Sequence, residues 1–212
     1  MVINIAIADD HPIVIDGLQR ILVHFPHIRL VGHYVNGTAL LAGLEEQVPD
    51  VLLLDIQMPD ITGDELMPII ARKYTDLKIL VLTNFDSALY ADNMFKRGAR
   101  GYLLKTAETA TLIKAIEVVF SGKEFVEEDM KEKIGKMHQQ HRNSGFSKTT
   151  LTMREKEVLQ LIVDGLTAPE IAKKIFLSLG TVKNYRISIM LKLDADNTAT
   201  LVKKALKLGL AQ

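Results

Sequence analysis

Residues 51–63, VLLLDIQMPDITG, contain four consecutive aliphatic residues that end at a carboxylate, Asp55. A short, continuous apolar run is typical of a strand that is buried on both faces of a parallel sheet. Pro59 and Gly63 follow, and both residue types suit a shaped turn. The stretch therefore predicts a core strand whose last residue emerges at a defined point on the rim of the sheet.

The same pattern extends over residues 1–122, where apolar strands alternate with helical periodicity. We expect strands at 2–8, 28–34, 51–54, 78–83 and 101–104, and helices at 12–24, 38–47, 64–74, 87–97 and 107–121. Five alternations of this kind predict an α/β domain with a doubly wound, flavodoxin-like, five-stranded parallel sheet.

The composition changes after Gly122. Residues 123–147 are polar, so we interpret them as a linker with a short helix over 126–138 and a joint around 141–150. Residues 148–212 show about four short helical segments and no strand pattern, which predicts a small all-α domain. We therefore expect domains at 1–122 and 148–212.

The formal net charge of zero hides an asymmetry between the two ends of the chain. Residues 1–147 carry 15 Lys and Arg against 20 Asp and Glu, whereas residues 148–212 carry 11 against 6. A basic end is a mild indication of nucleic-acid binding, although a solvated basic surface explains the charge about as well. The chain has no cysteine, no apolar run of membrane-spanning length and no signal-peptide pattern, so we expect a cytoplasmic protein with no membrane partner.

Polar residues gather where the expected strands end, which is where open α/β sheets bind ligands. Asp9 and Asp10 end the first strand, Asp55 the third and Thr83 the fourth, and Lys105 follows the fifth. Packed carboxylates repel unless a cation joins them, and oxygen ligands with no His or Cys nearby favour Mg²⁺. A lysine and a threonine then suit a phosphoryl group on Asp55, which would be a nucleophile that forms an acyl phosphate.

Each of these residues also has an ordinary structural explanation. A single Asp at a strand end is usually a turn former or a helix cap, and Thr83 or Lys105 alone would be a strand residue or a surface charge. The chemical interpretation is favoured because all five fall at carboxyl ends and because the first and third strands are neighbours in this topology. A phosphoaspartate site of the haloacid dehalogenase type would require Asp at position 57, which is Gln.

Residues 1–122 resemble the receiver domain of bacterial two-component response regulators. The resemblance is carried by Asp9-Asp10, the D-x-x-M-P-x-x-x-G pattern from Asp55 to Gly63, Thr83, and the GYLLK run ending at Lys105. It implies that Asp55 is the phosphoacceptor, and that Mg²⁺ is held by Asp9 through water and directly by Asp10, Asp55 and the backbone carbonyl of Gln57. It also implies that Thr83 and Lys105 contact the phosphoryl group, and that Tyr102 is the aromatic switch residue that changes rotamer with Thr83. Many receivers carry proline after this lysine, where this chain has Thr106.

The basic end predicts a helix-turn-helix. Apolar positions 159, 162 and 163 form the stripe of a first helix with Gly165 as its stop, Thr167 and Glu170 form a capping box, and Thr181 opens a third helix that runs to about residue 193. The third helix would enter the major groove, and the candidate DNA contacts are Thr181, Lys183, Asn184, Arg186, Ile187, Lys173 and Lys174. A small helical bundle with a solvated basic face fits the periodicity about as well.

The order of motifs in this segment resembles the LuxR-type DNA-binding domain, as it is joined to receivers in the NarL/FixJ family. The motifs are L-T-x-R-E-x-E-V-L (151–159), G-L (165–166), E-I-A (170–172), S-x-x-T-V-K (178–183) and K-L (192–193). The chain departs from the pattern at Tyr185, commonly His, and at Thr198, where Arg is frequent and where we expect a weakened interhelical or backbone contact.

Together the two resemblances imply a transcriptional response regulator and not an enzyme. A sensor histidine kinase would phosphorylate it, double-stranded DNA would be its target, and it would form a homodimer when phosphorylated or bound to DNA. Two alternatives stay open: a receiver that acts as a phosphate sink or protein-interaction module, and a constitutive DNA-binding protein. The sequence leaves open whether phosphorylation releases the DNA-binding domain or dimerises the receiver.

Overall fold

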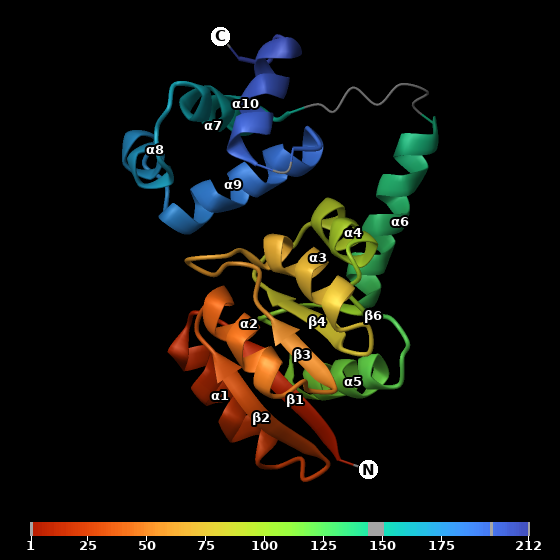
Figure 1. Ribbon diagram of the computed structural model, residues 1–212. Helices are drawn as coiled ribbons and strands as arrows, with labels where there is room; N and C mark the ends of the chain where they lie inside the picture. Colours follow the sequence, from red (N-terminus) through yellow and green to blue (C-terminus); the bar gives the residue numbers. More distant parts are fainter. Residues whose placement is uncertain (1, 144–150, 196, 212) are drawn as a thin grey trace. The chain divides into compact units, whose positions relative to one another are not determined.

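The computed structural model describes residues 2–143, 151–195 and 197–211 (Figure 1). The chain divides into two compact units, residues 1–135 and 136–212. Residues 144–150 of the predicted joint lie outside the described residues. The domain limits at 122 and 147 stay predictions.

The first unit is built on a parallel sheet with the strand order β2-β1-β3-β4-β5-β6. Its strands are β1 Ile3–Ala8, β2 Ile28–Tyr34, β3 Val51–Leu54, β4 Lys78–Thr83, β5 Gly101–Leu104 and β6 Phe125–Val126. The doubly wound parallel sheet is confirmed, but the expected count of five strands was wrong. The two-residue strand β6 lies in the predicted linker and pairs with β5. Backbone pairing over two residues produces no long apolar run, so the polar sequence of the linker did not predict this strand.

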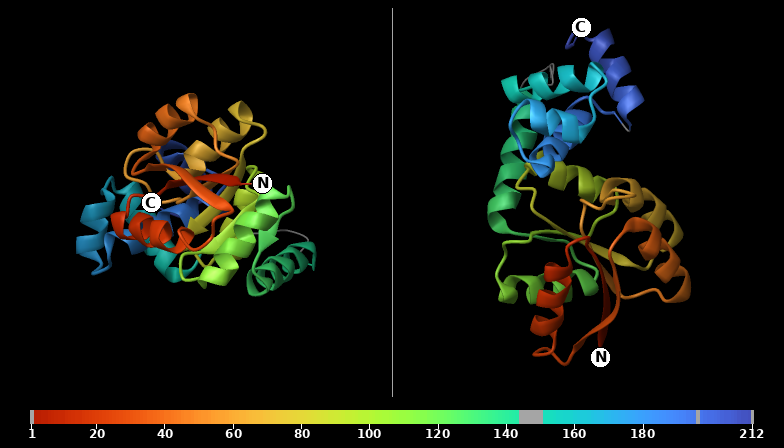
Figure 2. Two further views of the ribbon diagram at one scale, coloured as in Figure 1. Left: turned by 90° about the horizontal axis from the view of Figure 1, so that it is seen from below. Right: turned by 90° about the vertical axis from the view of Figure 1, so that its left-hand side faces the viewer.

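Five helices cover the two faces of this sheet. They are α1 Pro12–Leu22, α2 Gly37–Glu46, α3 Gly63–Lys73, α4 Ala88–Lys96 and α5 Thr109–Phe120. The right-hand view of Figure 2 shows α1 and α5 on one side of the sheet and α2 and α3 on the other. Consecutive strand residues such as Leu53 and Leu54 point to opposite faces and are both fully buried, which explains the uninterrupted apolar run of residues 51–54.

Helix α6, Glu128–Asn143, takes the place of the short helix that we expected over residues 126–138. It begins two residues later because residues 125 and 126 form β6. Met130 is buried, and the Lys133 ammonium lies 2.6 Å from both carboxylate oxygens of Asp86, in the loop between β4 and α4 (residues 84–87). The predicted linker is thus partly a component of the first unit.

Residues 151–195 and 197–211 contain four helices, as expected. They are α7 Met153–Val163, α8 Ala168–Lys174, α9 Leu179–Lys192 and α10 Thr198–Lys207. Their core is formed by Val158, Leu159, Ile171, Val182, Ile189, Leu201 and Ala205, with further apolar side chains around them. Gly165 has φ of +84° just after α7, which is the left-handed conformation that ends many helices and that glycine adopts without strain.

Helix α9 begins two residues before the expected start at Thr181. Ser178 caps it, because its hydroxyl accepts a hydrogen bond from the Thr181 backbone N–H at 3.0 Å. No helix within residues 2–143, 151–195 and 197–211 is both long and apolar enough to cross a membrane.

Candidate functional site

Strand register brings two acids of the first unit to the same point on the sheet rim. Ala8 of β1 pairs with Leu54 of β3, and the backbone N–H of Asp55 donates to the Ala8 carbonyl at 2.8 Å. Asp9 and Asp55 therefore leave neighbouring strands at the same level. The expectation that the first and third strands are adjacent is confirmed.

Lys105 joins these two carboxylates. Its ammonium lies 2.7 Å from Asp9 Oδ2 and 2.8 Å from Asp55 Oδ2, and its backbone N–H donates to the Thr83 carbonyl at 2.7 Å. Both acids are almost completely buried, with side-chain exposures of 2% and 3%. Burial raises the pKa of Asp55, and the Lys105 charge opposes that rise. Lys105 thus holds two buried acids together and offsets part of the effect of burial on Asp55.

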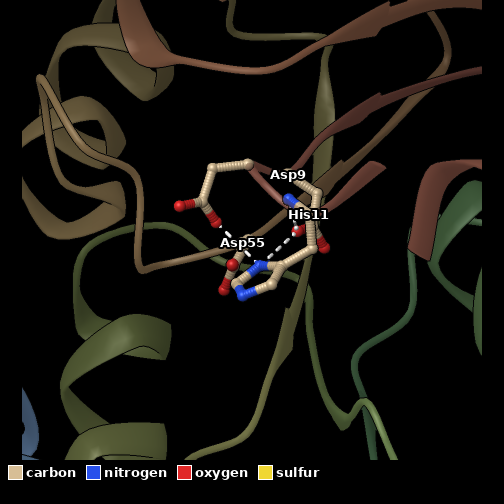
Figure 3. A group of neighbouring side chains, drawn as sticks. Asp9, His11 and Asp55 are labelled. Atoms are coloured by element: carbon tan, nitrogen blue, oxygen red, sulfur yellow. Dashed lines mark hydrogen bonds and ion pairs between the residues drawn. The ribbon is translucent and has the colours of Figure 1, made fainter. Parts of the chain in front are cut away.

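A histidine also lies in this pocket. Ligand atoms of Asp9, Asp10, His11 and Asp55 all lie within 4.8 Å of one another, and Figure 3 shows three of these side chains converging. His11 Nδ1 is 3.1 Å from Asp9 Oδ1 and 2.8 Å from Asp10 Oδ1. The expectation of a site with no His nearby was therefore wrong. The chain turns back at the N-cap of α1, which is His11 itself, and brings the imidazole over the acids.

The donor set suits a divalent cation. Asp10 Oδ1 is buried and lies 2.8 Å from His11 Nδ1, among the other potential ligand atoms of the pocket. Hard carboxylate oxygens at one point are the ligands that Mg²⁺ prefers. The backbone N–H of Gln57 donates to Asp55 Oδ1 at 3.2 Å, which places this segment beside the acid. Coordination by the Gln57 carbonyl stays a prediction.

Gly63 permits the close packing that shapes the loop after Asp55. A Cβ atom at this position would lie 2.7 Å from the Ile56 Cα and 2.9 Å from the Asp55 carbonyl oxygen. The Gly63 backbone N–H instead donates to the Ile56 carbonyl at 2.8 Å. The start of α3 is thus held directly against the strand end that carries Asp55.

Thr83 and Tyr102 are linked through a residue that the sequence analysis missed. The buried Thr83 hydroxyl accepts a hydrogen bond from the Phe85 backbone N–H at 3.2 Å, and the Phe85 carbonyl accepts one from the Tyr102 hydroxyl at 2.6 Å. Burial, with the nearby Asp86 charge, raises the pKa of Tyr102 above its usual range, so its hydroxyl stays a donor. The switch roles of Thr83 and Tyr102 stay predictions.

The candidate DNA contacts of the second unit lie on two helices. Lys173 and Lys174 are exposed at the end of α8, and the other five lie on α9. Helical geometry puts Lys183, Asn184 and Ile187 on the side of α9 away from its buried residue Val182. These assignments stay predictions.

Two further candidates make contacts within the second unit. The Thr181 hydroxyl lies 2.7 Å from the Ser178 hydroxyl. The Arg186 guanidinium donates a hydrogen bond to the Thr198 hydroxyl at the start of α10. Thr198 therefore supplies an interhelical contact at the position where we expected a weakened one.

Glu155 is a buried acid to which the sequence analysis assigned no role. Its carboxylate accepts hydrogen bonds from the Thr152 backbone N–H, the Ser188 hydroxyl and the Lys192 ammonium, each at 2.7 Å. Burial alone would raise the pKa of Glu155, but these hydrogen bonds outweigh it and hold the pKa below its ordinary value. Glu155 thereby fastens α7 to α9.

Comparison with known proteins agrees with this architecture. Residues 5–117 match the response regulator receiver domain, and residues 149–205 match the bacterial regulatory proteins of the luxR family. The chain is 36% identical over 212 residues to the oxygen regulatory protein NreC of Staphylococcus aureus (strain MRSA252), covering 96% of this chain and 97% of the relative. It is 32% identical over 222 residues to the transcriptional regulatory protein DegU of Brevibacillus brevis, with coverages of 98% and 94%.

A solved structure extends the likeness to both units. RcsB from Salmonella enterica serovar Typhimurium, bound to a promoter in the presence of a phosphomimetic, is 30% identical with a TM-score of 0.63, over 97% of this chain and 98% of that chain. The chain therefore belongs to the NarL/FixJ family of two-component response regulators, transcription regulators that join a receiver domain to a LuxR-type DNA-binding domain.

Proposed function

We propose that phosphorylation of Asp55 by a sensor histidine kinase switches the binding of double-stranded DNA by this regulator. One observation carries the proposal: Asp9, Asp10 and Asp55 share a pocket with Lys105, although about 95 residues of sequence separate its ends. An acidic pocket with one buried ammonium is the arrangement that phosphoryl transfer to a carboxylate requires.

The residues present fit Mg²⁺. Asp10, Asp55 and the Gln57 carbonyl would hold it, with Asp9 acting through water, and it would neutralise charge on the incoming phosphoryl group. The phosphorus–nitrogen bond of a phosphohistidine breaks as an Asp55 oxygen–phosphorus bond forms. The product is an acyl phosphate on Asp55, and the imidazole of the kinase is released.

The chain's own residues would then respond to the new charge. Lys105 already contacts Asp55 Oδ2, so its ammonium needs only a small shift to contact a phosphoryl oxygen. The Thr83 hydroxyl would turn toward the same group and give up the Phe85 N–H. Phe85 also holds Tyr102, so a change at Thr83 alters the loop between β4 and α4.

The second unit would supply DNA binding. Lys183 and Asn184 suit base edges in the major groove, whereas Lys173 and Lys174 suit phosphates. One solved RcsB structure, of a chain 29% identical to this one, contains two dimers bound to two parallel DNAs. We propose a homodimer on paired half-sites here as well, since one small helical domain neutralises few phosphates. Such a regulator acts in the bacterial cytoplasm and performs no catalytic turnover of its own.

The test combines phosphorylation with DNA selection on the full chain. With acetyl phosphate and Mg²⁺, intact-mass spectrometry should show one added phosphoryl group on the wild type and on Asp86→Asn, a matched control in a neighbouring loop, but none on Asp55→Asn. Selection from a random DNA pool should yield an operator that the phosphorylated wild type binds more tightly. Labelling of Asp55→Asn at the wild-type level, or operator binding unchanged by the phosphodonor, would refute the proposal.

DNA contacts have a separate control. Lys183→Ala and Asn184→Ala should weaken operator binding, with altered base preference at the contacted positions. Lys207→Ala, in the last turn of α10, should leave base preference unchanged. Equal effects of all three variants would contradict the placement of α9 in the major groove.

A further inference from the structure

We propose that His11 is a nitrogen ligand in the acidic pocket, through which the pocket binds first-row transition-metal ions such as Mn²⁺ and Co²⁺ more tightly than its carboxylates alone would. This inference deepens the proposed function, because it concerns the metal choice of the same site. It concerns the role of the His11 imidazole, which is not needed for the carboxylates of the pocket to bind Mg²⁺.

The positions of the ligand atoms carry the inference. One atom each from Asp9, Asp10, His11 and Asp55 lies within 4.8 Å of all the others. Ligands at about 2.0–2.2 Å from a small divalent ion are at most about 4.4 Å apart. Movements of a few tenths of an ångström would therefore bring all four atoms into a single coordination sphere.

His11 is held in place by its backbone. Its N–H donates to Asp9 Oδ1 at 2.9 Å, and Pro12 follows it with a fixed backbone angle at the first turn of α1. The side chain is 56% exposed, so the ring lies at the mouth of the pocket and an ion can enter from solvent. The imidazole is thus positioned before any ion binds.

Nδ1 of His11 lies close to two carboxylate oxygens. One nitrogen lies 3.1 Å from Asp9 and 2.8 Å from Asp10, and a single proton on it can point well at only one of them. A metal ion between these atoms would bind both carboxylates and the imidazole nitrogen together. The Nδ1 proton, where present, leaves to water as the metal–nitrogen bond forms.

The choice of metal follows from ligand type. Imidazole nitrogen suits transition metals, whereas Mg²⁺ prefers oxygen and gives up its waters reluctantly. His11→Asn keeps a hydrogen-bond donor near the position of Nδ1 and removes the nitrogen ligand. If His11 acted only as a hydrogen-bond donor, Asn would substitute for it and the affinity for every metal ion would be unchanged. If it acted only through its charge, the affinities for all divalent ions would change equally.

The experiment uses full-length wild type, His11→Asn, His11→Ala and the matched control His27→Asn, whose imidazole pairs with Glu117 at the surface. Pulsed electron paramagnetic resonance of bound Mn²⁺ should show coupling to a histidine nitrogen in the wild type and His27→Asn, and should lose it in both His11 variants. Competition titrations should show Co²⁺ affinity falling roughly tenfold or more in the His11 variants, since even indirect partners of a metal cost that much. Mg²⁺ affinity should change less than about twofold.

Nitrogen coupling absent from the wild type, or Mg²⁺ and Co²⁺ affinities that fall together, would overturn the inference. Thermal unfolding of each variant shows that a lost signal is not lost folding. Labelling with acetyl phosphate in Mg²⁺ separates the two proposals. A wild type that is labelled but shows no nitrogen coupling refutes only the ligand role, whereas a wild type that is not labelled refutes the phosphoacceptor site.

Discussion

Glu155→Gln is a direct test of the contact that fastens α7 to α9. The change keeps the shape of the side chain and removes its charge. The Gln amide oxygen can still accept from the Thr152 N–H, and its NH2 group can donate to the Ser188 hydroxyl, but the Lys192 ammonium loses its anion. The variant therefore isolates the ion pair in an otherwise unchanged packing.

The magnitude follows from burial. A hydrogen bond to a charged group contributes about 1.5–3 kcal/mol, and breaking a fully buried pair costs about 3–5 kcal/mol. The Lys192 side chain is 21% exposed and reaches water in part, so the lower range applies. We expect a loss of about 2 kcal/mol in the free energy of unfolding of the second unit.

Hydrogen exchange of the full chain measures this loss in one unit at a time. A loss of about 2 kcal/mol lowers the protection of α7 and α9 amides roughly 30-fold, with protection in β1 and β3 unchanged. Glu157→Gln is the matched control, since Glu157 pairs with Arg154 at the surface and such pairs contribute under about 1 kcal/mol. Equal protection in Glu155→Gln and Glu157→Gln would refute the role of the buried pair.

The pH dependence has a defined sign. The folded-state pKa of Glu155 lies below its ordinary value, so its stabilisation is fully present above the unfolded pKa of about 4.3 and is lost as pH falls through the folded value. The difference in unfolding midpoint between wild type and Glu155→Gln should be constant from about pH 8 to 6. It should shrink below about pH 4.3, and a difference that grows on acidification would contradict the assignment.

Three further predictions concern the first unit. Tyr102→Phe leaves the buried Phe85 carbonyl without its donor, so a denaturant titration should show a loss of about 1–2 kcal/mol. Gly63→Ala pushes a methyl group to 2.9 Å from the Asp55 carbonyl oxygen, so stability and the rate of acetyl phosphate labelling should both fall. Lys105→Met removes the charge that opposes the raised pKa of Asp55, so its destabilisation should grow as pH rises above about 4, and Mg²⁺ should relieve part of it.

Matched variants control these predictions. Gly17→Ala, in α1, meets no atom within 4 Å and should stabilise by about 0.5–1 kcal/mol, so a loss there would question the packing argument for Gly63. Tyr102→Phe should leave the protection of α7 amides unchanged. A Lys105→Met protein whose stability is independent of pH would refute the account of Asp55.

The fold was largely predictable because burial on both faces of a parallel sheet produces continuous apolar runs in the sequence. The strand expected at 51–54 is β3, and the one at 78–83 is β4. Parallel register then fixes the site, since residues that follow paired positions such as Ala8 and Leu54 must emerge together. Asp55 could thus be located without any coordinates.

The remaining features depend on contacts between distant segments. His11 was missed because a single exposed histidine after a strand has no periodicity, and only the turn into α1 brings it to Asp10. Glu155 has the position of the N3 residue of a capping box, and that box is present, but only packing reveals Lys192 beside it. The signal that would have found His11 is its position within two residues of Asp9, where a reversing chain returns to the strand end.

Hydrogen bonds and one ion pair connect Thr83, at the end of β4, to α6. Thr83 accepts from Phe85, and the adjacent Asp86 pairs with Lys133, so the loop that would respond to Asp55 is attached to the helix that runs on to residue 143. Both members of this pair are about half exposed, and such pairs contribute about 0–1 kcal/mol. A weak ion pair is compatible with a conformational switch. Phosphorylation of one residue changes the free-energy difference between two conformations by only a few kcal/mol. A strong buried pair at this position would hold α6 in one state whether or not Asp55 carried the phosphoryl group.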